Sequence, residues 1–306
     1  MWRAAVSGRT VLGGRALRAV CVIVGGVLVL AGCTNNTEES GPAVPKVTVD
    51  KVDAIAATLP DKIKQSGRLL VGVNVPYQPN EYKDASGRIV GFDVDLMDAV
   101  GSVLGVKVEY VESAFEKIIP AIQAGTYDVG MSSITDSKER QAQVDFTDYF
   151  KAGIQWVQQS GKPVDPDNAC GKKVSVQATT VEHTDEVPAK SEKCVAAGKA
   201  PIDIKPFDEQ SAATNALVLG QVDAMSADSP VTAYAIKQSD GKIESAGPLF
   251  DSAPYGWAVP KNSPLAAVLQ AALNHLIGNG QYRTITENWG VQDGAVTASV
   301  INGAER

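Results

Sequence analysis

Strand and helix patterns alternate along this chain, and the alternation occurs twice. From residue 68 the apolar periodicity predicts three strands and two helices, in the order 69–75, 93–105, 106–111, 115–125 and 127–133. After a pivot near 150–170 the order recurs, with elements at 172–178, from Thr180 onward, and at 202–207, 211–221 and 223–227. Such alternation builds open, mainly parallel sheets with helices on both faces. We therefore expect an α/β chain with two lobes.

Glycine, proline and a short acid refine the helix ends. Gly105 and Gly125 follow the first two helical patterns, where a left-handed residue commonly ends a helix. Asp93 stands at the start of the first pattern and is expected to cap it. Pro188 lies inside the helical pattern that begins at Thr180, so the length of that helix stays open.

The last part of the chain is expected to return to the first lobe. Residues 249–261 have a strand pattern, and apolar spacing predicts two helices, at 264–278 and 280–290. A chain that leaves lobe 1 and returns to it crosses between the lobes twice, which makes a hinge beside a cleft. The expected boundaries are 61–155 for the first part of lobe 1, 156–252 for lobe 2, and 253–306 for the return to lobe 1 with the C-terminal helices.

Composition argues against several classes of function. The 306 residues carry 28 Lys and Arg against 35 Asp and Glu, and this net charge of −7 disfavours sequence-independent binding of nucleic acid. Two histidines are too few for a His-rich zinc site, and no two of the four cysteines have CxxC spacing. We expect no metal and no cofactor.

The N-terminus has the layout of a secretory signal, because four arginines and no acidic residue precede an apolar run at 19–31. The run ends in the letters LAGC at 30–33, and this ending resembles the lipobox of bacterial lipoproteins. The resemblance implies a signal peptide at 1–32, a lipidated Cys33 as membrane anchor, and a tether that extends from Cys33 to residue 60. A plain signal peptide or an uncleaved anchor is the alternative.

Export changes how the remaining cysteines are interpreted. Cys21 leaves with the signal and Cys33 carries the lipid, so Cys170 and Cys194 remain as a pair in an oxidising compartment. We predict a disulfide between them. Two buried free thiols are the alternative.

Polar residues collect at the carboxyl ends of the expected strands, where open α/β sheets bind their ligands. In lobe 1 they are Asn74 to Tyr77 after the first strand, and Ser133, Thr135 and Arg140 after the third. In lobe 2 they are Gln177, Thr179 and Thr180 after the first strand, and Asp228 after the third.

An arginine on one lobe and a carboxylate on the other suit a zwitterion. The Arg140 guanidinium can bind a carboxylate bidentately, and free N–H groups at the helix start near Thr180 and Val181 add donors. Asp228, helped by the Thr135 hydroxyl and the Ser133 carbonyl, can accept hydrogen bonds from an ammonium. Together these groups predict a site for the α-carboxylate and α-amino groups of a free amino acid.

The same residues also have simpler interpretations. Arg140 is a solvated loop charge if it pairs with Glu139 or Asp136. Asp228 is an N-cap if its side chain bonds to the helix that follows it, and Thr179 and Thr180 are open to the same interpretation.

Several segments resemble one family. Residues 91–104 (GFDVDLMDAVGSVL) look like the signature of the family 3 extracellular solute-binding proteins, the receptors of polar amino acid ABC importers. Residues 115–150, the loop GKKVSVQATTVE, ADSP at 227–230 and PYGWAVPK at 254–261 are similar to the same family. The resemblance covers about 66–290 in the family's order, and it implies the type II periplasmic-binding-protein fold.

The resemblance also implies roles for individual residues. The family's carboxylate-binding arginine falls on Arg140, and the acceptor of the α-amino group falls on Asp228. The other positions that the family uses for ligand contact fall on Ser133 and Thr135, on the backbone of Thr180 and Val181, and on the aromatic pair Tyr77 and Phe115. Core packing is the alternative for the two aromatics.

Three positions depart from the family's pattern. Many members have glycine at the positions of Ser133 and Thr179, so close backbone approach is less certain there. Members that prefer cationic side chains often have an aspartate where Asn74 stands, and Gln177 is also neutral. We therefore expect a neutral polar or acidic side chain on the ligand, with Lys117 or Lys151 as a second cation if it is acidic.

The resemblance implies capture of the ligand by closure of the lobes and delivery to an ABC permease. We expect a monomeric, lipid-anchored, extracytoplasmic receptor and no enzyme. The alternatives are a ligand-presenting sensor on the same fold or, less favoured, a cyclohexadienyl-dehydratase-like enzyme. Only Glu81, Glu182 and His183 offer an acid or base near the cleft.

Overall fold

The computed structural model describes residues 44–305, which lie within one compact unit formed by residues 38–306. The expected signal peptide and lipidated Cys33 lie outside the described residues. Within residues 44–305, no helix has both the length and the apolar character needed to cross a bilayer.

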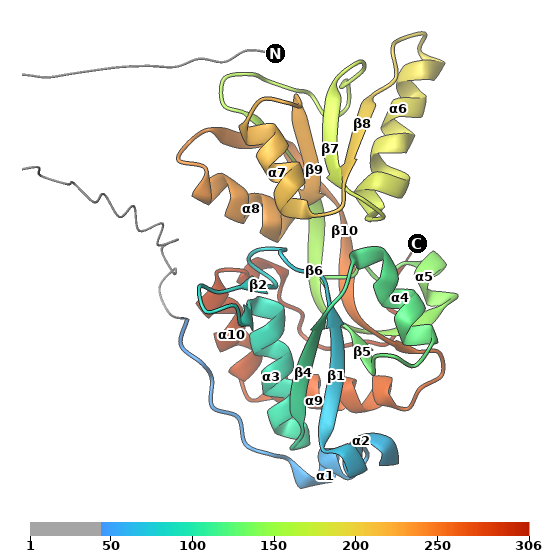
Figure 1. Cartoon of the computed structure of the whole chain (residues 1–306), viewed down its shortest axis with the longest axis vertical. Helices are drawn as coiled ribbons and strands as arrows, with labels where there is room; N and C mark the ends of the chain where they lie inside the picture. The colour runs from blue at the N-terminus through green and yellow to red at the C-terminus, as the bar shows by residue number, and fades with distance from the viewer. Residues whose placement is uncertain (1–43, 306) are drawn as a thin grey trace, which may run out of the picture. The chain divides into compact units, whose positions relative to one another are not determined.

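One eight-stranded sheet runs through the described chain in the order β4-β1-β5-β10-β6-β9-β7-β8 (Figure 1). Its strands, in chain order, are β1 (Arg68–Val73), β4 (Lys107–Glu112), β5 (Val129–Gly130), β6 (Val144–Gln159), β7 (Lys173–Gln177), β8 (Asp203–Phe207), β9 (Ala224–Asp228) and β10 (Ile243–Pro260). A separate two-stranded ribbon joins β2 (Tyr82–Lys83) and β3 (Ile89–Val90).

The two ends of the sheet form the two lobes. Strands β1, β4 and β5 are parallel at one end, which we call lobe 1, and β7, β8 and β9 are parallel at the other end, lobe 2. The long antiparallel strands β6 and β10 run through both lobes and are the two crossings. The expected two-lobed α/β fold is therefore confirmed, although the two sheets join into one. The lobe boundaries drawn from the sequence stay a prediction, because β6 and β10 cross without a break.

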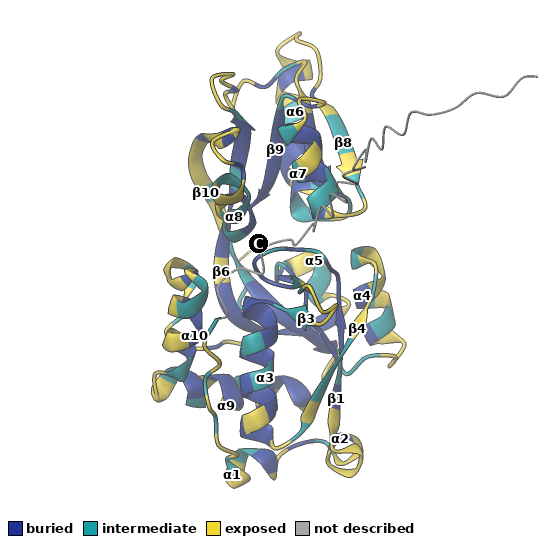
Figure 2. Ribbon diagram, turned by 60° about the vertical axis from the view of Figure 1, so that its left-hand side comes forward, coloured by how far each residue is buried: buried dark blue, intermediate teal, exposed yellow. Residues whose placement is uncertain are grey.

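Helices cover both faces of the sheet in each lobe (Figures 1 and 2). In lobe 1, α3 (Phe92–Leu104), α9 (Leu265–Gly278) and α10 (Gln281–Trp289) pack on one face, and α4 (Phe115–Gln123) packs on the other. In lobe 2, α6 (Val187–Ala196) packs on one face, and α7 (Gln210–Val218) and α8 (Ser229–Gln238) pack on the other. The short helical segments are α1 (Asp53–Ala56), α2 (Asp61–Ser66), α5 (Lys138–Gln141), a π-helix (Glu182–Glu186) and a 3₁₀ turn (Gln292–Gly294).

The alternation of side chains along the strands explains these layers. Leu69, Val71 and Val73 of β1 point to the face covered by α3 and α9, and all three are fully buried. Fully burying one such side chain contributes about 1.5–3 kcal/mol. On the opposite face, Ile118 and Ile122 of α4 form a second core cluster.

Several expected boundaries are confirmed and one is wrong. Gly105, with φ of 66°, ends α3, and Gly125, with φ of 71°, follows α4, as the sequence predicts. Asp93 does not cap α3: the N-cap is Gly91, and Asp93 lies in the first turn of the helix, where it is fully buried. The reason is tertiary, because this carboxylate accepts hydrogen bonds from Ser133 and Tyr149. Pro188 lies in the first turn of α6, directly after the π-helix, where a missing N–H is tolerated.

The predicted disulfide between Cys170 and Cys194 is present in lobe 2. Cys194 of α6 is buried in the core cluster on that helix's face of the sheet, and Cys170 packs against the same cluster. The bond therefore ties the loop before β7 to α6.

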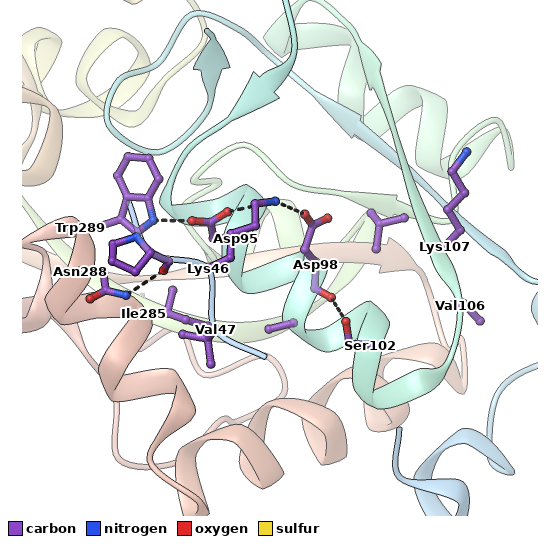
Figure 3. A pocket seen from close by; sticks show the side chains of 13 residues that line it. Lys46, Val47, Asp95, Asp98, Ser102, Val106, Lys107, Ile285, Asn288 and Trp289 are labelled. Carbon is purple, nitrogen blue, oxygen red and sulfur yellow. Dashed lines mark hydrogen bonds and ion pairs between the residues drawn. The ribbon is translucent and has the colours of Figure 1, made fainter. Parts of the chain in front are cut away.

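The segment before α1 lies on lobe 1 (Figure 3). Val47, Val49 and Val52 pack against the core cluster of α3, α9 and α10. The Lys46 ammonium lies 3.4 Å from a carboxylate oxygen of Asp98, and the carbonyl of Pro45 accepts a hydrogen bond from α10. Residues 44–60, which the sequence assigns to the tether, are therefore in contact with the domain where the structure describes them, because three valines have an apolar surface to cover.

Candidate functional site

The predicted polar residues meet in a small cavity between the lobes. Its volume is about 10 Å³, which is about the space of one water molecule. It is lined by Tyr77, Phe115, Ser132, Ser133, Thr135, Arg140, Gln177, Thr180, Val181, Glu182 and Asp228. Nine of the ten residues that the sequence marks for ligand contact are in this set, and Asn74 is the exception. These residues lie at or after the carboxyl ends of β1, β4, β5, β7 and β9, or in the helices that follow them.

Arg140 is turned inward. Its guanidinium donates hydrogen bonds to the carbonyl of Thr135 at 2.9 Å and, across the cleft, to the carbonyl of Thr179 at 3.2 Å. It also lies over the Phe115 ring, 5.7 Å from the centroid. Burial lowers the pKa of Arg140, while the charges of Glu182 and Asp228 oppose that shift. The interpretation of Arg140 as a solvated charge paired with Glu139 or Asp136 is wrong, because the side chain bonds to neither.

Asp228 occupies the N-cap position of α8, yet its side chain makes no capping hydrogen bond. Its carboxylate accepts a hydrogen bond from the Tyr77 hydroxyl at 2.9 Å, across the cleft. Burial raises the pKa of Asp228 to about 6, against the hydrogen bond from Tyr77 and the charge of Arg140. The carboxylate is therefore directed into the cavity and not at its own helix.

The start of the lobe 2 helix offers backbone donors to the same cavity. Thr180 and Val181 stand directly before the π-helix, and their N–H groups have no acceptor among the described loop and turn hydrogen bonds. Thr179 holds a left-handed conformation with φ of 63°, and its N–H donates to Nδ1 of His183 at 3.0 Å. Neither threonine hydroxyl caps the helix, since that of Thr180 donates to the carbonyl of Gln177.

Asn74 lies behind the cavity and not in its wall. Its Oδ1 accepts a hydrogen bond from Nε2 of Gln177 at 2.8 Å, and its Nδ2 donates to the carbonyl of Ser113. The contact to Gln177 crosses from lobe 1 to lobe 2, as do those of Tyr77 with Asp228 and of Arg140 with Thr179. Three interlobe hydrogen bonds thus hold this structure in a closed arrangement.

Two residues in the wall were not predicted as ligand contacts. Ser132 neighbours the predicted Ser133, and Glu182 follows the predicted Val181 at the helix start. Glu182 is 2% exposed, and its Oε1 has no hydrogen-bond partner among the described residues. Burial, and after it the charge of Asp228, raises the pKa of Glu182 to about 8. In the sequence, such residues can be found only by their position next to a strand end. That position does not show which of the neighbouring side chains turns into the cavity.

Lys117 and Lys151, the candidates for a second cation, do not line this cavity. Both side chains are exposed, and Lys151 lines a different cavity of about 740 Å³ beside the hinge. Within residues 44–305, Arg140 is thus the one cation in the wall of the interlobe cavity, where two carboxyl groups accompany it.

Comparison with known proteins finds relatives that bind amino acids. An arginine-binding protein ArgT from Corynebacterium glutamicum is 41% identical over 291 residues, which is 94% of this chain and 96% of that protein. An ancestral arginine-binding protein bound to arginine is 36% identical, with a TM-score of 0.67 over 73% of this chain and 98% of that one. The structure of an ancestral arginine-binding protein bound to glutamine is 37% identical, with a TM-score of 0.65 over 74% and 98%.

The family resemblance proposed from the sequence is confirmed as well. The model of the bacterial extracellular solute-binding proteins, family 3, matches residues 69–292, which include both lobes and every residue of the interlobe cavity. This chain belongs to family 3 of the bacterial extracellular solute-binding proteins.

Proposed function

We propose that the protein binds a free L-amino acid between its lobes and delivers it to an ABC import permease. The observation that carries the proposal is that Arg140 of lobe 1 and Asp228 of lobe 2 line one cavity. A guanidinium can bind the α-carboxylate bidentately, and an inward carboxylate can accept from the α-ammonium. The N–H groups of Thr180 and Val181 add donors for the α-carboxylate at a helix start.

Closure couples binding to transport in this proposal. Ligand contacts from both lobes exist together only when the lobes are closed, so ligand shifts the population towards the closed form. A ligand must take the place of the interlobe hydrogen bonds of Arg140 and Tyr77, because these occupy the groups proposed to bind it. The closed shape is then what a permease recognises.

For the ligand side chain we favour a basic or amide group, with L-arginine and L-glutamine as the first probes. The sequence favours a neutral polar or acidic side chain, and the acidic half of that expectation gains no support because Lys117 and Lys151 lie outside the cavity. Glu182 and Asp228 face one arginine in the wall, which favours a ligand without negative charge on its side chain. Asn74, whose amide argued against basic ligands, bonds to Gln177 and is occupied.

We further propose that the protein works as a monomeric receptor held by a lipid on Cys33 at the outer face of the cell membrane. The secretory layout and the LAGC ending support this placement. A sensor that presents its ligand to a signalling partner is the alternative, and adjacent permease and ATPase reading frames distinguish the two.

We propose that the protein is not an enzyme, because His183 is no free base: its Nδ1 accepts a hydrogen bond from the Thr179 N–H. Glu182 is the one acid that keeps a dehydratase-like activity under consideration. Turnover of a prephenate-like acid by the purified protein contradicts this part of the proposal, whereas stoichiometric binding without product supports it.

Calorimetry with the twenty amino acids tests the function directly. Arg140→Ala removes two charge-assisted hydrogen bonds to the ligand carboxylate, about 1.5–3 kcal/mol each, so affinity is expected to fall by about 10²–10⁴-fold with folding intact. Lys117→Ala, an exposed cation of the same lobe, is the matched control and is expected to bind as the wild type does. Unchanged affinity in Arg140→Ala refutes the ligand assignment.

A further inference from the structure

Two buried carboxyl groups lie beneath the lobe 1 wall of the cavity. Glu81 comes from the loop after β1, Asp93 comes from the first turn of α3, and both are 0% exposed. Neither forms an ion pair with a described lysine or arginine. Burying two acids without a cation costs folding free energy, so we looked for the contacts that these two carboxyl groups make.

Both carboxyl groups hold the turn that forms the cavity wall. Glu81 Oε1 accepts a hydrogen bond from the Ser132 hydroxyl at 2.7 Å. Asp93 Oδ2 accepts from the Ser133 N–H at 3.1 Å, from its hydroxyl at 3.0 Å and from the Tyr149 hydroxyl at 2.6 Å. Ser133 has φ of 48°, a conformation that non-glycine residues rarely adopt, and these bonds are what hold it there.

The two carboxyl groups influence one another and have one unsatisfied oxygen each. Glu81 Oε2 and Asp93 Oδ1 are buried and have no hydrogen-bond partner among the described residues, and the pKa of each group depends on the other. A single proton held between the two carboxyl groups would give both of these oxygens a partner. Burial and then the charge of Asp93 raise the pKa of Glu81 well above its usual range, whereas that of Asp93 rises only to about 6, so the proton resides on Glu81 near neutral pH.

We propose that Glu81 and Asp93 are positioning residues of the amino-acid site, which through one shared proton fix the Ser132–Ser133 turn against the ligand. The inference rests on the proposed function, since it concerns how that site is held. Ser132 and Ser133 line the cavity, so the loss of this proton places two like charges beneath them and moves the wall. The pair keeps a single negative charge behind the place where we expect the ammonium to bind.

Among residues 44–305, the titratable groups that face the pair from the surrounding elements are tyrosines. Tyr77 of the loop after β1, Tyr110 of β4, Tyr149 of β6 and Tyr282 of α10 interact electrostatically with one carboxyl or the other. The pKa of each tyrosine is raised, first by burial, so none of them gains charge in the physiological range. The protonation of the pair is therefore set by the two carboxyl groups themselves.

The glutamine variant separates positioning from mere structure. Glu81→Gln replaces the protonated acid with an amide that can still donate to Asp93 and accept from Ser132, but it has no proton to lose. We expect its dissociation constants for L-arginine and L-glutamine to stay within about threefold of wild type at pH 7. Glu81→Ala leaves Asp93 and the Ser132 hydroxyl without their partner, and we expect at least about tenfold weaker binding. Asp98→Asn changes a partly exposed acid of α3, the helix that carries Asp93, and is the control. Its dissociation constants are expected to match those of wild type.

The pH profile is the decisive measurement. The ratio of the wild-type dissociation constant to that of Glu81→Gln cancels the titration of the ligand and of Glu182 and Asp228, which both proteins share. We expect this ratio to rise at least about threefold between pH 7 and pH 10, because only the wild type can lose the shared proton. Coincident profiles, or equal weakening in Glu81→Gln and Glu81→Ala, overturn the inference while leaving the proposed function intact. No binding by wild type at any pH overturns the proposed function and the inference with it.

Discussion

Thr179 and Ser133 share an unusual backbone conformation but differ in what their side chains do. Ser133 lines the interlobe cavity and Thr179 directly precedes the lining residue Thr180. Both have positive φ, 63° for Thr179 and 48° for Ser133. A left-handed conformation costs a non-glycine residue about 1–2 kcal/mol, and a β-branched residue is a stronger outlier than serine. Replacing each residue by glycine therefore relieves the same kind of strain in two different settings.

For Thr179 the relief is expected to dominate. Its side chain is exposed and makes no hydrogen bond among those described, so glycine removes little contact. Glycine adds about 0.5–1 kcal/mol of unfolded-state entropy, which offsets part of the gain of about 1–2 kcal/mol. Thr179→Gly is thus expected to stabilise the ligand-free protein by about 0.5–1 kcal/mol.

For Ser133 the lost hydrogen bonds dominate. Its hydroxyl accepts from the Asn80 amide at 2.7 Å and donates to Asp93 at 3.0 Å, and the residue is only 4% exposed. Leaving a buried polar group without its partner costs about 1–3 kcal/mol, which exceeds the net relief of strain. Ser133→Gly is therefore expected to destabilise by about 1–2 kcal/mol, the opposite sign at a nearly equal φ.

Thermal unfolding of the two variants beside wild type measures both effects. For a protein of this size 1 kcal/mol corresponds to about 2–4 °C, so the melting temperatures of the variants should differ by about 3 °C or more. A lower melting temperature for Thr179→Gly, or equal shifts in both variants, refutes the reasoning that side-chain contacts decide the sign.

Two further outcomes concern charge and covalent structure. Burial raises the pKa of Asp228 to about 6, of Glu186 to about 7 and of Glu182 to about 8, so between pH 8 and pH 5 the folded state binds more protons than the unfolded chain. As the pH falls from 8 to 5, the ligand-free protein should therefore become more stable, while its affinity for the amino acid should fall because Asp228 becomes protonated. Thermal unfolding measures the first change and calorimetry measures the second, and the two should have opposite signs. Replacing Cys170 and Cys194 by serine removes the constraint on a loop with a sequence separation of 24, which should cost about 3 kcal/mol in urea unfolding; stability equal to wild type contradicts it.

The fold was largely predictable because its layers follow local patterns. Alternating apolar residues in β1 and spaced apolar residues in α3 and α9 each report burial on one face, and the sequence carries that information directly. The continuity of the sheet was not predictable, because β6 and β10 pair with each other through both lobes while each has its second neighbour in one lobe only, and β10 carries register shifts. The packing of residues 44–52, which lie within the predicted tether of 33–60, was not predictable for a similar reason. Three separated valines have no period of their own, and only the core cluster of lobe 1 gives them a surface to pack against.

The polar wall was predictable to the extent that strand ends define it. Nine predicted residues lie in the cavity because parallel strands carry their carboxyl ends to one edge, whatever their side chains do there. The sequence marks Glu81 and Glu182 only as acids near the cleft and Asp93 as a helix cap, and it does not mark Ser132. The contacts that these residues make were not predictable because they depend on partners from other elements. Asp93 in particular has the sequence position of a helix cap and bonds to Ser133 and Tyr149 instead.

Asp228 shows why a sequence position alone leaves such choices open. Asp228 lies at the end of β9 and the start of α8. Both an N-cap and an acceptor for a ligand ammonium are expected at that position. A side-chain cap contributes about 1 kcal/mol to a helix, and here that contribution is absent because the carboxylate bonds to Tyr77 across the cleft. Pro230 in the first turn of α8 lowers the need for a cap, since it has no N–H to satisfy. The carboxylate is thereby left for the cleft, where a ligand ammonium can compete with the Tyr77 hydroxyl for it.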